Sequence, residues 1–422
     1  MSDARPPQVE ALVEHLFRRE AGRMVAALTR VFGPGELTLA EDVVQDALMK
    51  ALDRWPYAGV PDNPSGWLYT VARNGALDRL RRRQGWTAVR HEVAILDESR
   101  LEQLPEPRFR GEVGDDQLRL IFVCCHPALR GEDRVALTLK TVCGFGVGEI
   151  SSALLISEQA LSQRLVRAKR RIREQDLKFE MPPPEALEDR LNTVLNVLYL
   201  MFNEGYSPSS GDAAIRTDIC VEAARMAELV ADHTIAGRPQ SHALAALLLC
   251  HGARLPGRTD AAGELLLLEE QDRDRWDREA ISRGMTHLRA AMAGEHVTEL
   301  HLEAGIAACH VAADSVQDTD WRAILGYYDR LLALAPTPVR ALNRAVALAM
   351  VDGPHAALSA LEQLAETGEL TGYYLLPATR GELLRRTGQT AEARAALQQA
   401  LSLAGSQPSK TLIARRIAAL PT

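Results

Sequence analysis

The sequence has few aromatic residues, few cysteines and no long apolar run. Aromatic residues make up 5% of 422 residues, and 6 cysteines are spread along the chain. They show neither the spacing of a disulfide framework nor the repeated close pairs of a zinc module. Apolar runs such as 243–250 are far shorter than the roughly 20 residues of a membrane span, and the N-terminus lacks a signal-peptide pattern. We therefore expect a cytoplasmic protein without membrane association.

Motifs of common catalytic sites are also missing. The sequence contains no Gly-rich phosphate loop, no nucleophile elbow and no paired-histidine zinc helix. Cys124, Cys125 and His126 could form a metal or redox site, but they directly follow the apolar stretch 120–123. Buried thiols in a hydrophobic core are the better interpretation. We expect a protein that is not an enzyme and that has no cofactor and no bound metal.

The composition favours helices, and charge is unevenly distributed. Hydrophobic residues make up 46% of the chain and charged residues 25%, with much Ala, Leu, Arg and Glu, so an all-α, multidomain protein is expected. The net charge of -7 hides two basic segments. Residues 63–90 hold six arginines against Asp78 alone, and 157–178 hold seven basic residues against three acids. The acidic connector 92–116 lies between them.

The first two predicted helices lie on either side of a Gly-Pro-Gly break. Residues 8–32 carry an apolar helical stripe that ends at Gly33. A second helix is predicted to begin at Thr38, with Glu41 completing a capping box. Its outer face carries an acidic patch, whose spacing places the side chains together: Asp42, Gln45 and Asp46. This patch could meet a basic partner, or it could be an ordinary solvated face.

A loop and a basic helix follow. Residues 55–62 are rich in Pro and Gly and predict a loop, after which Asn63 caps a helix that runs to about Gln84. The outward face of this helix suits a phosphate backbone, and it consists of Arg73, Asn74, Asp78, Arg81 and Arg82. The alternative is a solvated helix end, since arginine also complements the dipole at a helix C-terminus.

The second basic segment predicts a helix-turn-helix. Residues 147–154 form its first helix, Leu155 and Ile156 the turn, and Ser157 caps a second helix with an apolar side of Leu161, Leu165, Ala168 and Ile172. Gln159, Ser162, Gln163 and Arg167 project from the outer face, where Gln and Arg can pair with base edges. A purely structural helical hairpin is the alternative, which the density of basic residues disfavours.

Three motifs in residues 8–178 resemble those of extracytoplasmic-function (group IV) sigma factors of bacterial RNA polymerase. They are Ala40–Asp46, then Trp67–Asn74 with Asp78–Arg82, and finally Glu149–Ile150 with Arg164–Lys169. The chain departs from the family at Leu155, where members usually have glycine. The resemblance implies two small helical sigma domains, a linker that threads the polymerase cleft, core RNA polymerase and promoter DNA as partners, and promoter-specific transcription initiation.

The resemblance also implies roles for individual residues. The acidic patch would dock the clamp helices of the largest polymerase subunit. The first basic helix and its preceding loop would melt and read the minus-ten element through Trp55, Asn63, Arg73, Asn74, Asp78, Arg81 and Arg82. The helix-turn-helix would read the minus-thirty-five element through Gln159, Ser162, Gln163, Arg164, Arg167, Lys169 and Arg170. A stand-alone helix-turn-helix regulator with a C-terminal sensor domain remains the alternative function.

The rest of the chain exceeds what a minimal sigma factor needs. After the prolines at 182–184, the stretches 198–206 and 269–276 resemble segments of a sigma-factor subgroup whose members end in tetratricopeptide-like helices. Leu348, Gly353 and Ala356 recur 35 residues later as Leu383, Gly388 and Ala391. Such helical repeats usually bind peptides or protein segments. We therefore expect a regulatory or interaction domain with a protein or peptide partner, although an extension that only packs is the alternative.

These observations predict five successive segments. They are sigma domain 2 (8–84), a linker (85–114), sigma domain 4 (115–178), a Pro-rich linker (179–190) and a helical extension (191–422) with tetratricopeptide-like repeats from about 320. Asn203, Glu204, Asp272, Arg273 and Asp274 could line a polar pocket in the extension. Networks that cap helix ends are the more usual role of such residues.

Overall fold

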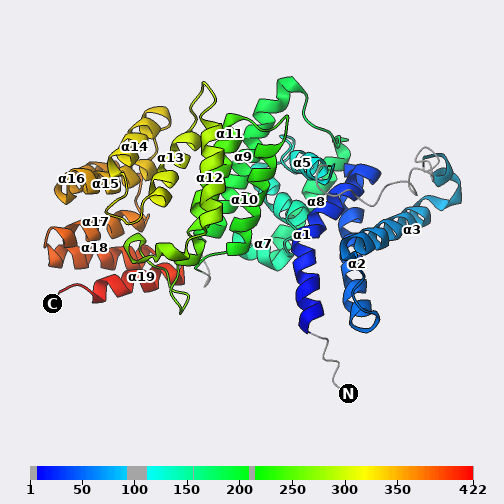
Figure 1. Cartoon of the computed structure of the whole chain (residues 1–422), viewed down its shortest axis with the longest axis horizontal. Helices are drawn as coiled ribbons and strands as arrows, with labels where there is room; N and C mark the ends of the chain where they lie inside the picture. Colours follow the sequence, from blue (N-terminus) through cyan, green and yellow to red (C-terminus); the bar gives the residue numbers. More distant parts are fainter. Residues whose placement is uncertain (1–6, 93–111, 155, 209–213, 422) are drawn as a thin grey trace, which may run out of the picture. The chain divides into compact units, whose positions relative to one another are not determined.

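The computed structural model describes residues 7–92, 112–154, 156–208 and 214–421. Over these ranges the chain is helical and contains no strand, so the predicted all-α fold is confirmed (Figure 1). The chain divides into two compact units, Met1–Val197 and Leu198–Thr422. Each unit is described by itself.

Three long helices begin the first unit. Helix α1 (Pro7–Phe32) ends at Gly33, whose φ of 85° lies in the left-handed region that glycine tolerates. A 3₁₀ turn, η1 (Pro34–Glu36), leads directly into α2 (Leu37–Ala58), which packs against both α1 and α3 (Pro64–Glu92). Helix α3 therefore extends eight residues beyond the predicted end at Gln84.

The predicted capping box of α2 is wrong. The helix begins at Leu37 and its N-cap residue is Glu36, so Thr38 lies inside the first turn and cannot cap it. The reason is that α2 follows η1 directly, with Glu36 as the last residue of η1 and the N-cap of α2. No residue in the extended conformation that a Ser or Thr cap requires lies between them. Glu41 instead directs its carboxylate to Thr141 and Lys169, more than 90 residues later in the chain.

The predicted loop begins too early. Trp55 lies in the last turns of α2, which also contains Pro56, and its side chain is 3% exposed. Its ring packs against that of Trp67 on α3, with 5.5 Å between the ring centroids. Burial of a large aromatic side chain outweighs the helix-breaking tendency of the following proline. The Asn63 cap is confirmed, because its side chain accepts a hydrogen bond from the Gly66 amide at 3.0 Å.

The helix-turn-helix prediction is confirmed at both helices. Helices α5 (Glu112–Cys124) and α6 (Gly131–Leu137) and a short π-helix, η2 (Thr138–Val142), precede α7 (Val147–Leu154) and α8 (Glu158–Glu174). Ser157 caps α8 by accepting from the Ala160 amide at 3.2 Å. The four predicted apolar residues of α8 are its buried ones: Leu161, Leu165, Ala168 and Ile172. Leu155 in the turn lies outside the described residues.

The first unit extends into α9 (Pro184–Tyr206), which begins within the predicted linker and starts with a proline. Arg190 on this helix donates a hydrogen bond to the Phe122 carbonyl oxygen of α5 at 2.6 Å. Its guanidinium also lies over the Phe122 ring, 5.8 Å from the centroid. The first half of α9 is therefore tied to the core of the helix-turn-helix domain.

The second unit continues with helices in succession. They are α10 (Thr217–Asp232), α11 (Pro239–Ala253), α12 (Arg278–Ala291), α13 (Glu299–Ala312), α14 (Trp321–Leu334), α15 (Pro338–Val351), α16 (Pro354–Glu366), α17 (Leu375–Arg386), α18 (Thr390–Leu403) and α19 (Gln407–Ala418). From α10 to α19 each helix packs against the next.

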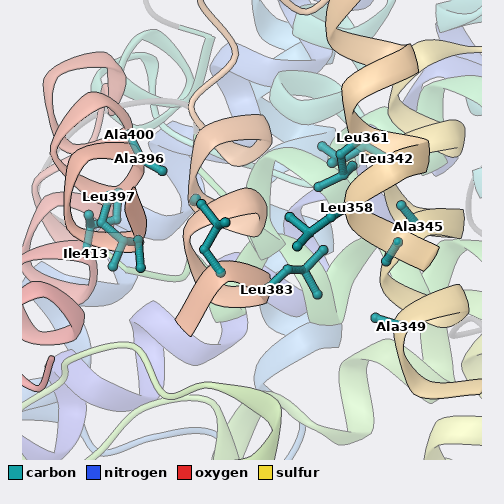
Figure 2. Packing of buried hydrophobic residues seen from close by; sticks show 14 of the residues in the cluster. Leu342, Ala345, Ala349, Leu358, Leu361, Leu383, Ala396, Leu397, Ala400 and Ile413 are labelled. Carbon is teal, nitrogen blue, oxygen red and sulfur yellow. The ribbon is translucent and has the colours of Figure 1, made fainter. Parts of the chain in front are cut away.

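The weak 35-residue repeat corresponds to two helical hairpins. Gly353 lies in the turn between α15 and α16, and Gly388 in the turn between α17 and α18, with φ of 91° and 78°. Both turns need a left-handed residue, which explains the recurrence of glycine. In Figure 2, Leu358 of the first hairpin lies beside Leu383 of the second, so the hairpins share one apolar core.

Candidate polymerase and nucleic-acid interfaces

The predicted acidic patch lies on the exposed side of α2. Asp42, Gln45 and Asp46 are all exposed, while the opposite side of the helix is buried. Arg79 of α3 reaches two of them: its Nη2 lies 2.5 Å from Asp46 Oδ2, and its Nη1 lies 3.6 Å from Asp42 Oδ2. These side chains are 38% to 53% exposed, so the pairs contribute only about 0–1 kcal/mol. A cationic partner could displace Arg79 at little cost.

The outward face of α3 carries the predicted minus-ten residues. Asn63, Asn74, Asp78, Arg81 and Arg82 are exposed, and Arg73 is half-buried. Arg73 Nη2 lies 3.5 Å from Asn74 Oδ1, which orients the two side chains along the same face. Trp55 does not belong to this surface, because its ring is enclosed between α2 and α3.

Helix α8 exposes most of the predicted minus-thirty-five residues. Gln159, Ser162, Gln163, Arg167 and Arg170 are exposed. The remaining two are paired with acids of other elements. Arg164 Nη2 lies 2.9 Å from Glu132 Oε2, and Lys169 forms an ion pair with Glu41 of α2. Arg170 also lies 3.4 Å from Glu174 Oε1 within α8, but both of these side chains are more than half exposed. Five of the seven side chains are therefore accessible to a ligand in this conformation.

A basic hollow beside α8 was not predicted from the sequence. A cavity of about 700 Å3 lies between the start of α6 and the second half of α8, and Arg130, Arg167, Arg170 and Arg171 line it together with Asp133 and Glu174. Arg130 lies 37 residues before Arg167, so no local pattern could associate them. Four guanidinium groups around one hollow suit a phosphate-bearing ligand.

The two cysteines of the Cys-Cys-His stretch are part of the hydrophobic core, as predicted, whereas His126 is half-buried. Cys124 and Cys125 are fully buried at the end of α5, and burial raises the pKa of Cys125 to about 11. The His126 Nδ1 accepts a hydrogen bond from the Ala128 amide at 3.1 Å, which shapes the turn. Within the described residues, no group of three or more His, Cys, Asp or Glu side chains could hold a metal ion.

Three of the polar residues that were predicted to line a pocket do so: Asp272, Arg273 and Asp274 line a hollow of about 300 Å3 together with residues 314–317. Asp272 and Arg273 also bind backbone groups of this region. Asp272 caps the 3₁₀ turn η5 (Arg273–Arg275) by accepting from the Asp274 amide at 3.0 Å. Arg273 donates to the carbonyl oxygens of His310 and Ala313 at the end of α13, at 2.8 Å and 2.6 Å. Arg258 donates likewise to Tyr206, the last residue of α9, at 2.5 Å. The two guanidinium groups therefore lie at the C-termini of α13 and α9, where a positive charge interacts favourably with the negative end of the helix dipole.

Two histidines are buried beside these arginines. Burial, together with the charge of Arg254, lowers the pKa of His251 to about 3 and that of His310 to about 4. The His251 ring contacts that of Tyr206, and the His310 ring contacts that of Trp321, with centroids 5.3 Å apart in each pair. Neither Nδ1 has a hydrogen-bond partner in the described part of the chain. Both rings are therefore held neutral.

We expect this unit to lose stability on acidification from pH 6.5 to about 4. The unfolded histidines bind protons below about pH 6.5, whereas the folded ones stay neutral until about pH 4 or 3, so stability falls with pH in that window. Each histidine contributes up to roughly 1.4 kcal/mol per pH unit. Urea denaturation of His310→Gln at pH 5 and 7 should show a smaller pH difference than the wild type. His355→Gln, at an exposed position on α16, should leave that difference unchanged.

No helix in the described ranges is long and apolar enough to cross a membrane. Residues 16–86 match the family described as sigma-70 region 2, and residues 119–172 match the family described as sigma-70, region 4. Residues 190–292 match a family of unknown function, DUF6596. The two sigma-70 matches thus cover α2, most of α3 and most of α8.

Two relatives extend these matches. The chain is 39% identical over 381 residues to uncharacterized protein R00370 of Rhizobium meliloti (strain 1021), covering 90% of this chain and 89% of that protein. It is 31% identical over 140 residues to the ECF RNA polymerase sigma factor SigL of Mycobacterium tuberculosis, covering 33% of this chain and 75% of SigL. No solved structure matches the chain. The chain therefore belongs to the extracytoplasmic-function sigma factors, and it directs transcription initiation.

Proposed function

We propose that three exposed surfaces of the first unit, on α2, α3 and α8, each bind a different part of the transcription machinery. The acidic patch of α2 binds core RNA polymerase, the outward face of α3 contacts the minus-ten element, and α8 reads the minus-thirty-five element in the cytoplasm. The observation that carries this proposal is the alternation of charge: an exposed acidic face on α2 and exposed Asn, Gln and Arg side chains on α3 and α8. Acidic side chains suit a protein partner, whereas the others suit DNA.

The minus-ten surface consists of Asn63, Arg73, Asn74, Asp78, Arg81 and Arg82. The arginines neutralise phosphates, and the asparagine amides can hydrogen-bond to an unpaired base. Trp55 is left out because it is 3% exposed. Its contact with Trp67 instead fixes the angle at which the chain enters the loop before α3. The positioning of this loop, rather than the ring itself, is the contribution of Trp55.

On α8, base reading and backbone contact fall to different side chains. Gln159, Ser162 and Gln163 lie in the first half of the helix, which enters the major groove in helix-turn-helix proteins. Arg130, Arg167, Arg170 and Arg171 surround the basic hollow and would hold a phosphate of the adjoining strand. This division assigns specificity to the N-terminal half of α8 and affinity to the hollow.

We expect Gln163→Ala and Arg171→Ala to weaken promoter binding in different ways. Loss of a bidentate base contact costs about 1–3 kcal/mol at one base pair, so Gln163→Ala should relax the preference at a single position. Arg171→Ala should weaken binding to all sequences and reduce the salt dependence by about one phosphate contact. Binding of the polymerase holoenzyme to a set of minus-thirty-five variants at two salt concentrations distinguishes these effects. A change in sequence preference with Arg171→Ala would contradict the assignment.

The extension is proposed to regulate the sigma domains or to bind a protein or peptide partner. What supports this is the series of helical hairpins from α14 to α19, an architecture that commonly presents an extended binding surface. We place its beginning at Leu198, seven residues after the predicted residue 191, since the residues up to 197 belong to the first unit.

The decisive experiment is transcription from a genomic promoter library by core polymerase, with and without the full-length chain, followed by sequencing of the RNA starts. New starts that share two upstream elements are the expected result. Core binding without new starts would indicate that the extension holds the factor inactive. If the chain bound specific duplex DNA tightly but did not bind core polymerase, the stand-alone regulator would replace this proposal.

A further inference from the structure

The two sigma domains of the first unit are fastened to one another by a group of contacts around Glu41. Its carboxylate accepts a hydrogen bond from the Thr141 hydroxyl at 2.5 Å and forms an ion pair with Lys169 of α8. The Glu41 and Lys169 side chains are only 13% and 15% exposed. Ion pairs in such sheltered positions are screened little by salt, and removing one partner is costly.

Further contacts join the same surfaces. Arg173 of α8 donates to the Gly35 carbonyl oxygen at 3.1 Å, and Arg30 of α1 lies 3.4 Å from Asp116 of α5. The Asp116 side chain is 4% exposed. The backbones also approach closely, because a Cβ atom added at Gly22 of α1 would lie 1.7 Å from the Val142 carbonyl oxygen. The two domains thus meet through a packed interface rather than a single ion pair.

This arrangement is incompatible with simultaneous contact to both promoter elements. The elements are named for positions about 25 base pairs apart, and DNA rises about 3.4 Å per base pair, so roughly 80 Å separate them. Domains that touch through Glu41 and Lys169 cannot lie at both places. Lys169 is also one of the proposed DNA-contacting residues, and here its ammonium group is held by Glu41.

We infer that the free chain rests in a closed state, in which Glu41, Thr141 and Lys169 latch the minus-thirty-five-reading domain onto the core-binding domain. The acidic patch stays exposed in this state. Core polymerase can therefore bind the closed chain first, and separation of the domains then releases Lys169 for DNA. The conclusion that this closed state controls promoter reading rests on the proposed role of α8. The existence of the closed state rests only on the contacts between the two domains and does not depend on that role.

The test is single-molecule energy transfer between dyes at Lys50→Cys on α2 and Gln175→Cys at the end of α8, both exposed positions, in the full-length chain without polymerase or DNA. The native cysteines are buried or half-buried, which limits competing labelling. The wild type should give one high-transfer population. Glu41→Gln should lower the closed-to-open ratio about tenfold, or about 1.4 kcal/mol, and Glu41→Lys should lower it further.

Three additional variants control for misfolding. Combining Glu41→Lys with Lys169→Glu restores opposite charges and should return the high-transfer population. Gly22→Ala should open the domains without altering any charge, whereas Gly326→Ala on α14, where an added Cβ meets nothing within 4 Å, should not. Low transfer in the wild type, or equal transfer in the wild type, Glu41→Lys and Gly22→Ala, would overturn the latch. Because no DNA is present, this result is independent of whether α8 reads the minus-thirty-five element.

Discussion

Replacing Asp46 with arginine should weaken binding of the chain to core RNA polymerase by at least about 100-fold. Removing one partner of a desolvated charge pair at an interface costs about 2–5 kcal/mol, and reversing the charge adds repulsion. Within the free chain the substitution should be mild, because Asp46 is 53% exposed and its pair with Arg79 contributes little. Affinity of labelled chain for core polymerase, measured by fluorescence anisotropy, provides the readout.

Two controls separate lost binding from lost folding. Glu188→Arg makes the same change of charge at an exposed position on α9 and should leave the affinity unchanged. Combining Asp46→Arg with Arg79→Asp restores an opposite-charge pair between α2 and α3 but leaves the polymerase facing the wrong charge. We expect this double variant to fold like the wild type and still not bind. Unchanged binding of Asp46→Arg would refute the assignment of this face of α2.

Local sequence patterns predicted the helix-turn-helix well because its stability depends on local features. The apolar residues of α8 recur at helical spacing, and Ser157 supplies a side-chain cap at the required place. The glycines at 353 and 388 were informative for a similar reason, since each occupies a left-handed turn position. In such elements the sequence neighbours of a residue are also its structural neighbours.

The predictions failed where a residue has its partner far along the chain. Glu41 fits a capping box by spacing, but its carboxylate is used by Thr141 and Lys169, which no local pattern contains. The same is true of Arg79, which lies 33 residues from the acidic residue that it pairs with. Trp55 was assigned to a loop because Pro56 follows it, and only the tertiary contact with Trp67 keeps it helical.

The first seven residues of α9, 184–190, were assigned to a linker, and the position of this helix predicts a large effect of truncation. A chain that ends at residue 183 should melt at least about 10 °C below one that ends at residue 197, because a loss of 1 kcal/mol lowers the midpoint of a small domain by about 4–8 °C. The shorter chain loses the hydrogen bond and ring contact of Arg190 with Phe122. It also loses buried apolar side chains of α9: Leu187, Leu191, Val194, Leu195 and Val197.

Thermal unfolding of the two fragments by circular dichroism tests this expectation, and Arg190→Met in the longer fragment isolates the contribution of the guanidinium. Equal midpoints for the two fragments would mean that α9 does not support the helix-turn-helix domain. A truncation at the prolines before α9 would impair promoter reading by destabilising the domain that contains Phe122, and the loss would resemble a requirement for the extension. Only a truncation after residue 197 separates regulation by the extension from the stability of the sigma domains.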